Sequence, residues 1–354
     1  MIPVPSIEYV NVRIRSFHSR LFNRDTYEIL LSGDNLGALT TFLLDHPLYS
    51  SDIETALKEL PEREGLERGV TDHFGRCVSH VLHMSHEKIR SLFETALSSF
   101  DIKNLKAVLL ARHRGLPFQK VRDMIIPCGT LTRGKYSEIF HQTDMDGIIQ
   151  NLATGCPYCA NALKQAVSET VEQKTYVRFL NSMEAHYYNN ILNYFNDSDE
   201  NSSVLIDIVR FEIDLKNITS SLKNIWENNK TGPKDPATYL KGGTLSIPFL
   251  NEMSLVSKLD DALVMIESTK FHKAVEKGII YYAETGFLHE MERFFEEVFI
   301  MKTQAYRRFQ PFGVGVFISY VWAQFVELTN LRTIINGVAF KTGAGQIRKG
   351  IIYV

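Results

Sequence analysis

The residues with the clearest chemical potential are the thiols of the stretch Cys156-Pro157-Tyr158-Cys159. Two cysteines separated by two residues carry out thiol redox chemistry when a helix N-terminus lowers the thiolate pKa. Such a motif belongs near the start of a βαβ unit, whereas here it follows a helical pattern over 146–152. We therefore expect Pro157 and Tyr158 to be turn residues that begin a helix, with redox chemistry as the alternative.

A second group of reactive types is a run of histidines with one cysteine. Neighbouring members at helical spacing share a face on which a metal ion can bind. A structural zinc site needs four ligands in tight geometry, and neither an H-E-x-x-H motif nor paired C-x-x-C motifs are present. We expect core or surface side chains rather than a metal site. The members are His73, Cys77, His80, His83 and His86.

Other candidate motifs do not fit catalysis or nucleotide binding. The glycines of 313–315 lack a third glycine and a preceding strand, and those of 343–345 lead into Gln-Ile-Arg rather than Gly-Lys-Ser/Thr. We expect no cofactor, no bound nucleotide and no enzyme activity. The basic clusters at 306–309 and 112–114 are predicted to be solvated helix ends, with contact to an acidic partner or a lipid headgroup as the alternative.

Composition narrows the class of protein further. The chain has 354 residues, of which 44% are hydrophobic, so it can bury a large core in two or three units. Its 39 basic residues are balanced by 41 acidic ones, which argues against non-specific nucleic-acid binding as the main activity. The most apolar run, 309–325, is interrupted by Gln, Pro and Gly, and we expect no membrane span. The four cysteines and the lack of a signal pattern favour the cytoplasm.

The elements that must position any site are predicted to be helices. Between 101 and 114, aliphatic residues recur at the i, i+3, i+4 spacing of a helix, with Asp101 as its expected N-cap and Gly115 as its stop. No series of alternating strands is evident, so the fold is predicted to be all-α, with a polar break at 196–203 and a linker at 227–241. Further helices are expected over 158–172, 177–195, 204–225, 269–282, 286–307 and 316–335.

An internal repeat is the strongest pattern in the chain. The segments D-I-K-N-L-K, D-L-K-N-I-T and E-L-T-N-L-R share an acid, an asparagine three residues later and an aliphatic residue directly after it. Their asparagines are 113 residues apart in both intervals. The repeat residues are Asp101, Asn104 and Leu105; Asp214, Asn217 and Ile218; and Glu327, Asn330, Leu331 and Arg332.

Other landmarks keep a similar period. Arg122 and Arg348 are 226 residues apart, each with an isoleucine pair beginning three residues later, and Arg13 precedes Arg122 by 109. We predict three copies of a helical unit of about 110 residues, with pseudo-threefold symmetry. Their expected bounds are 1–120 with an N-terminal lead, 121–234 and 235–354.

A buried asparagine without a partner would cost about 1–3 kcal/mol. Three asparagines in one register therefore predict one hydrogen bond made three times, to the backbone of a neighbouring loop or helix. The acid three residues earlier suits the first turn of a helix, where the positive end of the helix dipole lies. We favour this structural role over one ligand site per repeat.

These motifs resemble the C subunit of archaeal and bacterial V/A-type ATPases, which is the counterpart of the d subunit of eukaryotic V-ATPases. The likeness spans the chain and is strongest at 327–337 and 346–348, which look like the family's E-x-x-N-L-R-x-I-x-x-G…I-R ending. The helix 9–15, with a tyrosine and two arginines, is similar to the family's opening helix. The chain departs from the pattern at Thr219, where the other copies have Lys106 and Arg332.

The resemblance implies a non-catalytic, funnel-shaped rotor part. Such proteins receive the central axle, made of the D and F subunits, and sit on the membrane rotor ring of a proton- or sodium-translocating ATPase or synthase. This implies a peripheral position at the cytoplasmic face, with the membrane reached through protein partners. It implies neither nucleic acid nor a directly bound nucleotide. A free-standing helical-repeat scaffold and a C-P-Y-C thiol redox protein are the alternatives.

Overall fold

The computed structural model describes residues 6–33, 35–169, 175–195, 199–231, 239–285 and 289–353. Within these residues the regular secondary structure is α-helical and no strand occurs, which confirms the predicted all-α class. Part of the predicted break, 196–198, and part of the predicted linker, 232–238, lie outside the described residues.

The N-terminal third contains six helices, of which the sixth is the longest. Side-chain oxygens of Ser6, Asn23 and Asn35 cap the first three helices by accepting a hydrogen bond from the backbone N–H three residues on. The helices are α1 (Ile7–His18), α2 (Arg24–Ser32), α3 (Leu36–Asp45), α4 (Ser50–Leu57), α5 (Glu62–Met84) and α6 (Glu87–His113).

Twelve helices follow in the rest of the described chain. Thr132, Asp144 and Thr175 cap α8, α9 and α11 in the same way. The helices are α7 (Phe118–Arg122), α8 (Arg133–His141), α9 (Met145–Ala153), α10 (Pro157–Ser168), α11 (Tyr176–Tyr194), α12 (Glu200–Thr231), α13 (Ile247–Leu255), α14 (Leu259–Glu267), α15 (His272–Thr285), α16 (His289–Phe309), α17 (Val314–Ala339) and α18 (Ala344–Lys349).

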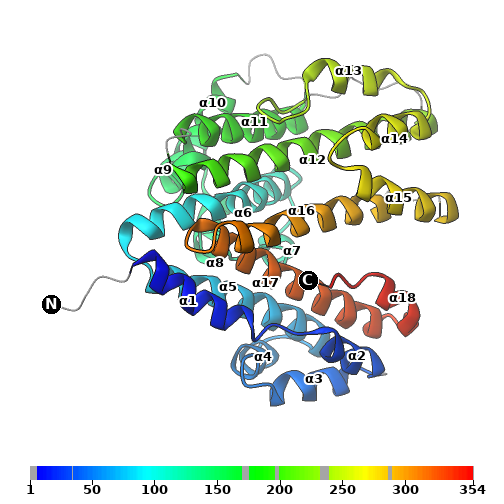
Figure 1. Cartoon of the computed structure of the whole chain (residues 1–354). Helices are drawn as coiled ribbons and strands as arrows, with labels where there is room; N and C mark the ends of the chain where they lie inside the picture. Colours follow the sequence, from blue (N-terminus) through cyan, green and yellow to red (C-terminus); the bar gives the residue numbers. More distant parts are fainter. Residues whose placement is uncertain are drawn as a thin grey trace.

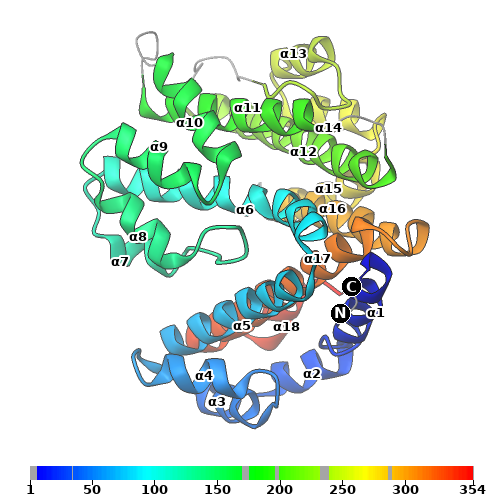
Figure 2. The same cartoon turned by 90° about the vertical axis from the view of Figure 1, so that its left-hand side faces the viewer.

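The helix lengths recur in order. The long helices α6 and α12 are each followed by helices of about 9, 9, 12–14 and 19–21 residues, with the short α7 intervening after α6. A similar set, α2 to α5, precedes α6. Figures 1 and 2 show the three sets of short helices in separate parts of the periphery, around α6, α12 and α17.

The third long helix, α17, is a core element. It is long and apolar enough to cross a membrane by length and composition, yet 83% of its most apolar window is buried within the fold. It packs against α1, α5 and α16, and Phe317 stacks on Phe93 of α6 with ring centroids 3.8 Å apart. The burial explains why so apolar a run occurs here, because α17 is surrounded by other helices.

Each asparagine of the repeat makes the same pair of hydrogen bonds. Its Nδ2 donates to one backbone carbonyl, and its Oδ1 accepts from the N–H of the same residue, 22 or 23 positions further on. The N–O distances are 2.7–3.1 Å. The carboxamide thus ties its long helix to the loop that follows it. The pairs are Asn104 with Ile126, Asn217 with Leu240, and Asn330 with Ile352.

The acids of the first two copies hold the same loops. Asp101 accepts from the N–H groups of Thr130 and Leu131, and Asp214 accepts from the N–H of Leu245 and the hydroxyl of Thr244. Both carboxylates are fully buried. The expected positions as an N-cap or in a first helical turn are wrong, because both acids lie in the middle of helices that begin at Glu87 and Glu200. They cap loops of other segments instead of their own helix.

The acid of the third copy has partners at the other end of the chain. Glu327 accepts from the N–H of Phe22 and from the Tyr49 hydroxyl, whose oxygen is 2.5 Å from Oε1. Burial raises the pKa of Glu327 to about 7, against the opposing effect of these two donors. Because Asn330 on the same helix holds Ile352, α17 binds both the N-terminal helices and the C-terminal segment.

We predict that Asn330→Ala destabilises the fold by about 1–3 kcal/mol, because it leaves the backbone N–H and C=O of buried Ile352 without their partner. Thermal and urea unfolding of the full chain measure the loss. Asn181→Ala, at an exposed helical asparagine, is the matched control and should leave the melting temperature nearly unchanged. An unchanged melting temperature in Asn330→Ala, together with lost binding to a partner, would contradict the structural role.

Candidate functional site

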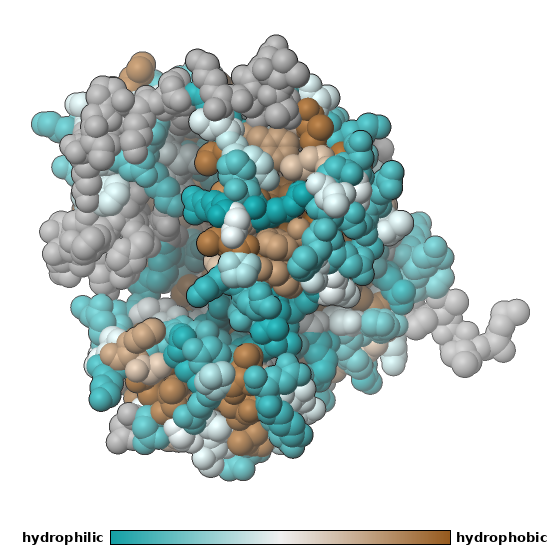
Figure 3. Space-filling view, turned by 180° about the vertical axis from the view of Figure 1, so that it is seen from behind, coloured by the Kyte–Doolittle hydropathy of each residue, from teal (hydrophilic) through white to brown (hydrophobic). Residues whose placement is uncertain are grey.

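The candidate site is a hollow of about 960 Å³ bounded by the long helices α6, α12 and α17 together with α11 and α16. An α-helix with its side chains is about 10–12 Å across, so this volume matches about two turns of helix. The walls combine charged side chains with aromatic rings, and hydrophilic and apolar residues are also interleaved on the surface seen from behind (Figure 3). Such a mixture is typical of a surface that binds protein.

Ion pairs cross the floor of the hollow and join three helices. Glu184 of α11 lies between Lys106 of α6 and Lys216 of α12, with the Lys216 ammonium 2.8 Å from its carboxylate. A second pair, 2.9 Å long, joins Lys103 of α6 to Glu212 of α12. The three lysines and two glutamates thus link α6, α11 and α12 through opposite charges at close range.

The electrostatics of this network follow from its burial. Burial by itself would raise the pKa of Glu184, but Lys216 and Lys106 hold it at about 2. Burial opposes ionisation of Glu212 as well, yet Lys103 and Lys216 outweigh it and the pKa of Glu212 is lowered. The carboxylates are therefore ionised at neutral pH, and loss of one partner would leave a buried charge uncompensated, at a cost of about 3–5 kcal/mol.

Aromatic rings form the wall beside the ion pairs. Trp322 of α17 packs edge-on against Phe299 of α16 at 4.6 Å and against Phe325 at 5.4 Å between ring centroids. The Lys103 ammonium lies 5.5 Å from the centroid of the Trp322 ring. Rigid aromatic groups next to charges supply contact area at a small loss of conformational entropy, as in protein interfaces.

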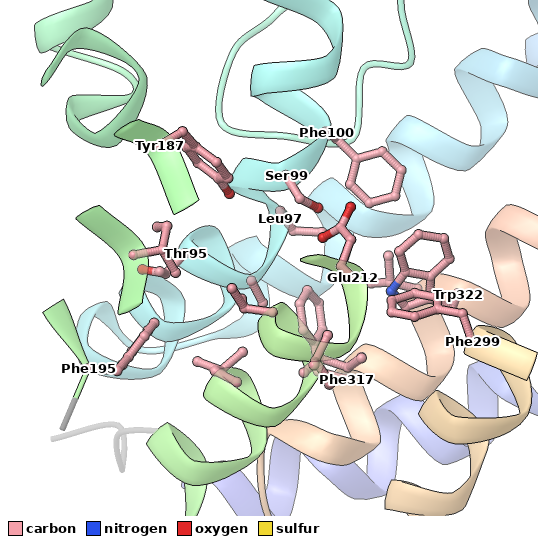
Figure 4. Close-up of a pocket in the computed structure, with 17 residues that line it drawn as sticks. Thr95, Leu97, Ser99, Phe100, Tyr187, Phe195, Glu212, Phe299, Phe317 and Trp322 are labelled. Atoms are coloured by element: carbon pink, nitrogen blue, oxygen red, sulfur yellow. The ribbon is translucent and has the colours of Figure 1, made fainter. Parts of the chain in front are cut away.

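A smaller cavity of about 30 Å³ lies deeper, between α6, α11, α12, α16 and α17 (Figure 4). Glu212 and Trp322 line both this cavity and the large hollow. The small cavity has room for about one or two water molecules. It is a packing defect beneath the hollow and too small for a ligand.

The thiol pair lies in the core. Pro157 is the first residue of α10, as predicted for the turn, and Cys156 and Cys159 are 1% and 0% exposed with their sulfurs 2.6 Å apart. Burial raises the pKa of the Cys159 thiol. Thiol redox chemistry requires an accessible cysteine with a lowered pKa, so this environment favours a packing role.

The histidines have separate partners. His73 is buried against Asp52, with Nδ1 3.2 Å from the carboxylate, while His80 packs on Phe17 and His83 bonds to the backbone of its own helix. Among the described residues, no three His, Cys, Asp or Glu side chains are placed to share a metal ion.

The remaining repeat positions divide into core and surface. The aliphatic residues after the asparagines are buried, whereas the arginines differ in their contacts. Arg122 pairs with Asp123, Arg348 pairs with Glu28, and Arg13 lies over the ring of Phe17. The common register therefore does not give these arginines a common contact. The buried aliphatic residues are Leu105, Ile218 and Leu331.

Sequence reasoning missed the ion pairs of the hollow. Lys103 and Lys216 occupy the same position of the repeat, one residue before the asparagine, and this was the available signal. Nothing in the sequence pairs them with Glu184 or Glu212, because those pairs depend on how the helices pack.

Comparison with known proteins identifies the family. The sequence matches the family described as ATP synthase (C/AC39) subunit over residues 10–350. The chain belongs to this family. It is therefore a subunit of a rotary ATPase or ATP synthase, a membrane-associated complex in which its partners are other proteins.

Similar proteins are the C subunits of archaeal A-type ATP synthases. That of Methanocaldococcus jannaschii is 21% identical, covering 99% of this chain and 88% of the relative. That of Pyrococcus furiosus is 26% identical, covering 96% of this chain and 89% of the relative. That of Methanosphaera stadtmanae is 23% identical, covering 92% of this chain and 82% of the relative. The family resemblance noted from the repeat motifs is thus confirmed.

We predict that the Glu184 network makes the free energy of unfolding decrease at low pH. The pKa of Glu184 is lower in the folded chain than the usual 4.5, so its contribution is present above about pH 5 and is lost as pH falls toward about 2. The pKa difference corresponds to about 3 kcal/mol. Urea unfolding across this range should show a shallower loss of stability in Glu184→Gln than in the native chain.

The control is Glu138→Gln, which removes an exposed carboxylate from a surface pair with Lys135. This variant should keep the native pH dependence. Equal slopes for Glu184→Gln and the native chain between about pH 5 and 2 would show that the buried pairs contribute no pH-dependent stability.

Proposed function

We propose that this protein is the non-catalytic central-stalk adaptor of a rotary V/A-type ATPase or synthase. It couples the rotor axle, formed by the D and F subunits, to the membrane rotor ring during proton or sodium transport. The observation that carries the proposal is the hollow between α6, α12 and α17 in a chain of the C/AC39 family. Its charged and aromatic walls suit the end of a helical axle.

The proposed architecture is three copies of one unit, related by a pseudo-threefold axis and forming a funnel. The three identical asparagine contacts and the recurring order of helix lengths support it. Along the chain the copies are 1–120, 121–234 and 235–354. In space, α2 to α5 take the place beside α17 that the following set of helices takes beside α6 and α12. The reason is that Glu327 holds Phe22 and Tyr49 in the way that Asp101 and Asp214 hold the loops that follow their own helices.

An arrangement in which the three units are linked to one another suits a part that transmits torque. A load on one unit reaches the others through helices joined by buried hydrogen bonds and ion pairs, and close-packed protein interiors have low compressibility. Reactive side chains are not required for such a role. The proposed position is peripheral, on the cytoplasmic face of the membrane, with the end away from the axle resting on the ring.

We predict that Asn181→Arg with Ser220→Arg blocks assembly of the axle. Both residues line the hollow, both are exposed, and neither belongs to the ion pairs. Two long cations should fill the space and weaken binding of the D and F subunits at least tenfold, about 1.4 kcal/mol. Pull-down of the purified subunits measures the effect, and the melting temperature monitors folding.

The matched control places the same charges outside the hollow, as Ser51→Arg with Asn251→Arg. This variant should bind the axle normally. Normal binding by the Asn181→Arg, Ser220→Arg variant would exclude the hollow as the axle site. A chain that never co-purifies with the membrane ring would favour the free-standing scaffold instead.

The thiol alternative has its own test. We predict that replacing Cys156 and Cys159 together by serine leaves ATP hydrolysis coupled to ion transport, because the adaptor needs no thiolate. Ion pumping by membrane vesicles that contain the variant complex measures coupling. Loss of coupling with an intact, fully assembled complex would restore a redox role for the pair.

A further inference from the structure

A second hollow, of about 600 Å³, lies along one face of α16. The residues of α16 that line it, from Glu297 to Arg308, are mostly three or four positions apart and so form one stripe of the helix. The 11 steps from 297 to 308, at 1.5 Å each, make this stripe about 16 Å long. The segment 351–353, which is non-helical and follows α18, forms another wall. We call this hollow the α16 groove.

The walls of the α16 groove are held together by apolar and polar contacts. Ile300 of α16 and Ile352 of the C-terminal segment pack in one small core cluster, and both line the groove. His18, at the end of α1, also lines it, with Nε2 3.4 Å from the Gln304 side-chain oxygen and Nδ1 3.0 Å from the Arg307 guanidinium. The lining residues therefore belong to one continuous site.

The charges that line the α16 groove do not balance. Lys277 and Glu297 form an ion pair at 3.1 Å, which leaves Arg307 and Arg308 as a surplus of positive charge. Among the described residues, neither arginine pairs with a carboxylate. Burial and the charge of Arg307 lower the pKa of His18, so that its ring is neutral at pH 7. Arginines that lack a counter-charge in a concave surface attract an external anion.

The rest of the α16 groove offers apolar surface. Ile300, Ile351 and Ile352 are 5%, 5% and 7% exposed and form its floor, whereas Met301 is 49% exposed. Methionine has a flexible, polarisable side chain that adapts its shape to an apolar partner. The groove thus combines apolar contact along α16 with positive charge at the end of this helix.

We propose that the α16 groove binds an acidic segment of a partner protein, with its carboxylates beside Arg307 and Arg308 and its apolar side chains against the isoleucines. An extended chain advances about 3.3 Å per residue, so about five residues fit along the groove. Charge-assisted hydrogen bonds from arginine to carboxylate fix the direction of the segment.

This proposal goes beyond the adaptor role. The α16 groove and the hollow proposed for the axle lie on neighbouring flanks of α16 and have Ile300 as their one common lining residue. Binding of an acidic segment in the groove does not depend on what the hollow receives.

A bilayer and a free phosphate match the α16 groove less well. A bilayer is flat and contacts the rim of a groove rather than a recessed apolar floor. A phosphate ion contacts the arginines and leaves the apolar surface uncovered. An acidic protein segment uses both, as peptides that bind in grooves do.

Photo-crosslinking within the intact enzyme tests the proposal. The complex carries p-benzoylphenylalanine in place of Met301, it is purified through another subunit, and mass spectrometry identifies the linked fragment. We expect a link to a protein segment that has at least two Asp or Glu residues within about five positions of the linked residue. The same photoreactive group in place of Leu255, which is 85% exposed and outside the groove, should not link to that segment.

A synthetic peptide of the linked segment then measures the role of charge on the purified full-length chain. Arg307→Gln with Arg308→Gln should weaken its binding by a factor of about 10 or more. Arg307→Glu with Arg308→Glu should prefer a peptide in which Lys replaces each acid. The control, Arg114→Gln with Lys120→Gln, removes two exposed charges outside the groove and should bind like the native chain. Melting temperatures establish that all variants fold.

Several results would overturn the proposal. They are a group at position 301 that links to lipid alone or to no subunit, a linked segment without acids, and equal loss of binding in the control and groove variants. Calorimetry with inorganic phosphate tests the small anion. Phosphate binding that requires Arg307 and Arg308, in a complex without a protein link at position 301, would assign the groove to a small anion instead.

Discussion

One buried carboxamide on each long helix determines how the following loop is held. The asparagine donates to the C=O and accepts from the N–H of one residue, and so supplies both hydrogen bonds that a neighbouring backbone would otherwise make. It does so for Ile126, Leu240 and Ile352. A shorter side chain cannot reach, and an apolar one leaves both backbone groups unpaired, which costs about 1–3 kcal/mol. The loops held at Ile126 and Leu240 lead into the short helices of the periphery (Figure 2), whereas Ile352 lies in the segment after the last helix, α18.

The acid three residues earlier extends the same principle to the whole molecule. In two copies it fixes the loop that follows along the chain, and in the third Glu327 fixes the segment around Phe22, near the other end of the sequence. Segments near both ends of the chain therefore form hydrogen bonds with α17. The long helices surround a hollow, and the Glu184 and Glu212 ion pairs link α6, α11 and α12 within it.

The sequence predicts the helical class and the equivalence of Asn104, Asn217 and Asn330, because periodicity and register are local properties of the chain. It misplaces Asp101 at a helix start, since an acid in a buried mid-helix position has the same sequence signal as a cap. The partners of Glu327 and of Glu184 depend on which helices pack together, and spacing along the sequence carries no record of that. Family membership came from motifs, whereas the hollow required the structure.

The central claim is that the hollow receives the rotor axle. A cryo-electron microscopy map of the intact enzyme tests it most directly. The account predicts density for the end of the axle inside the hollow, against Lys103, Asn181 and Trp322, with the opposite end of the protein seated on the membrane ring. A map that places this chain on an outer stator, or that shows the axle bound elsewhere with the hollow vacant, would contradict it.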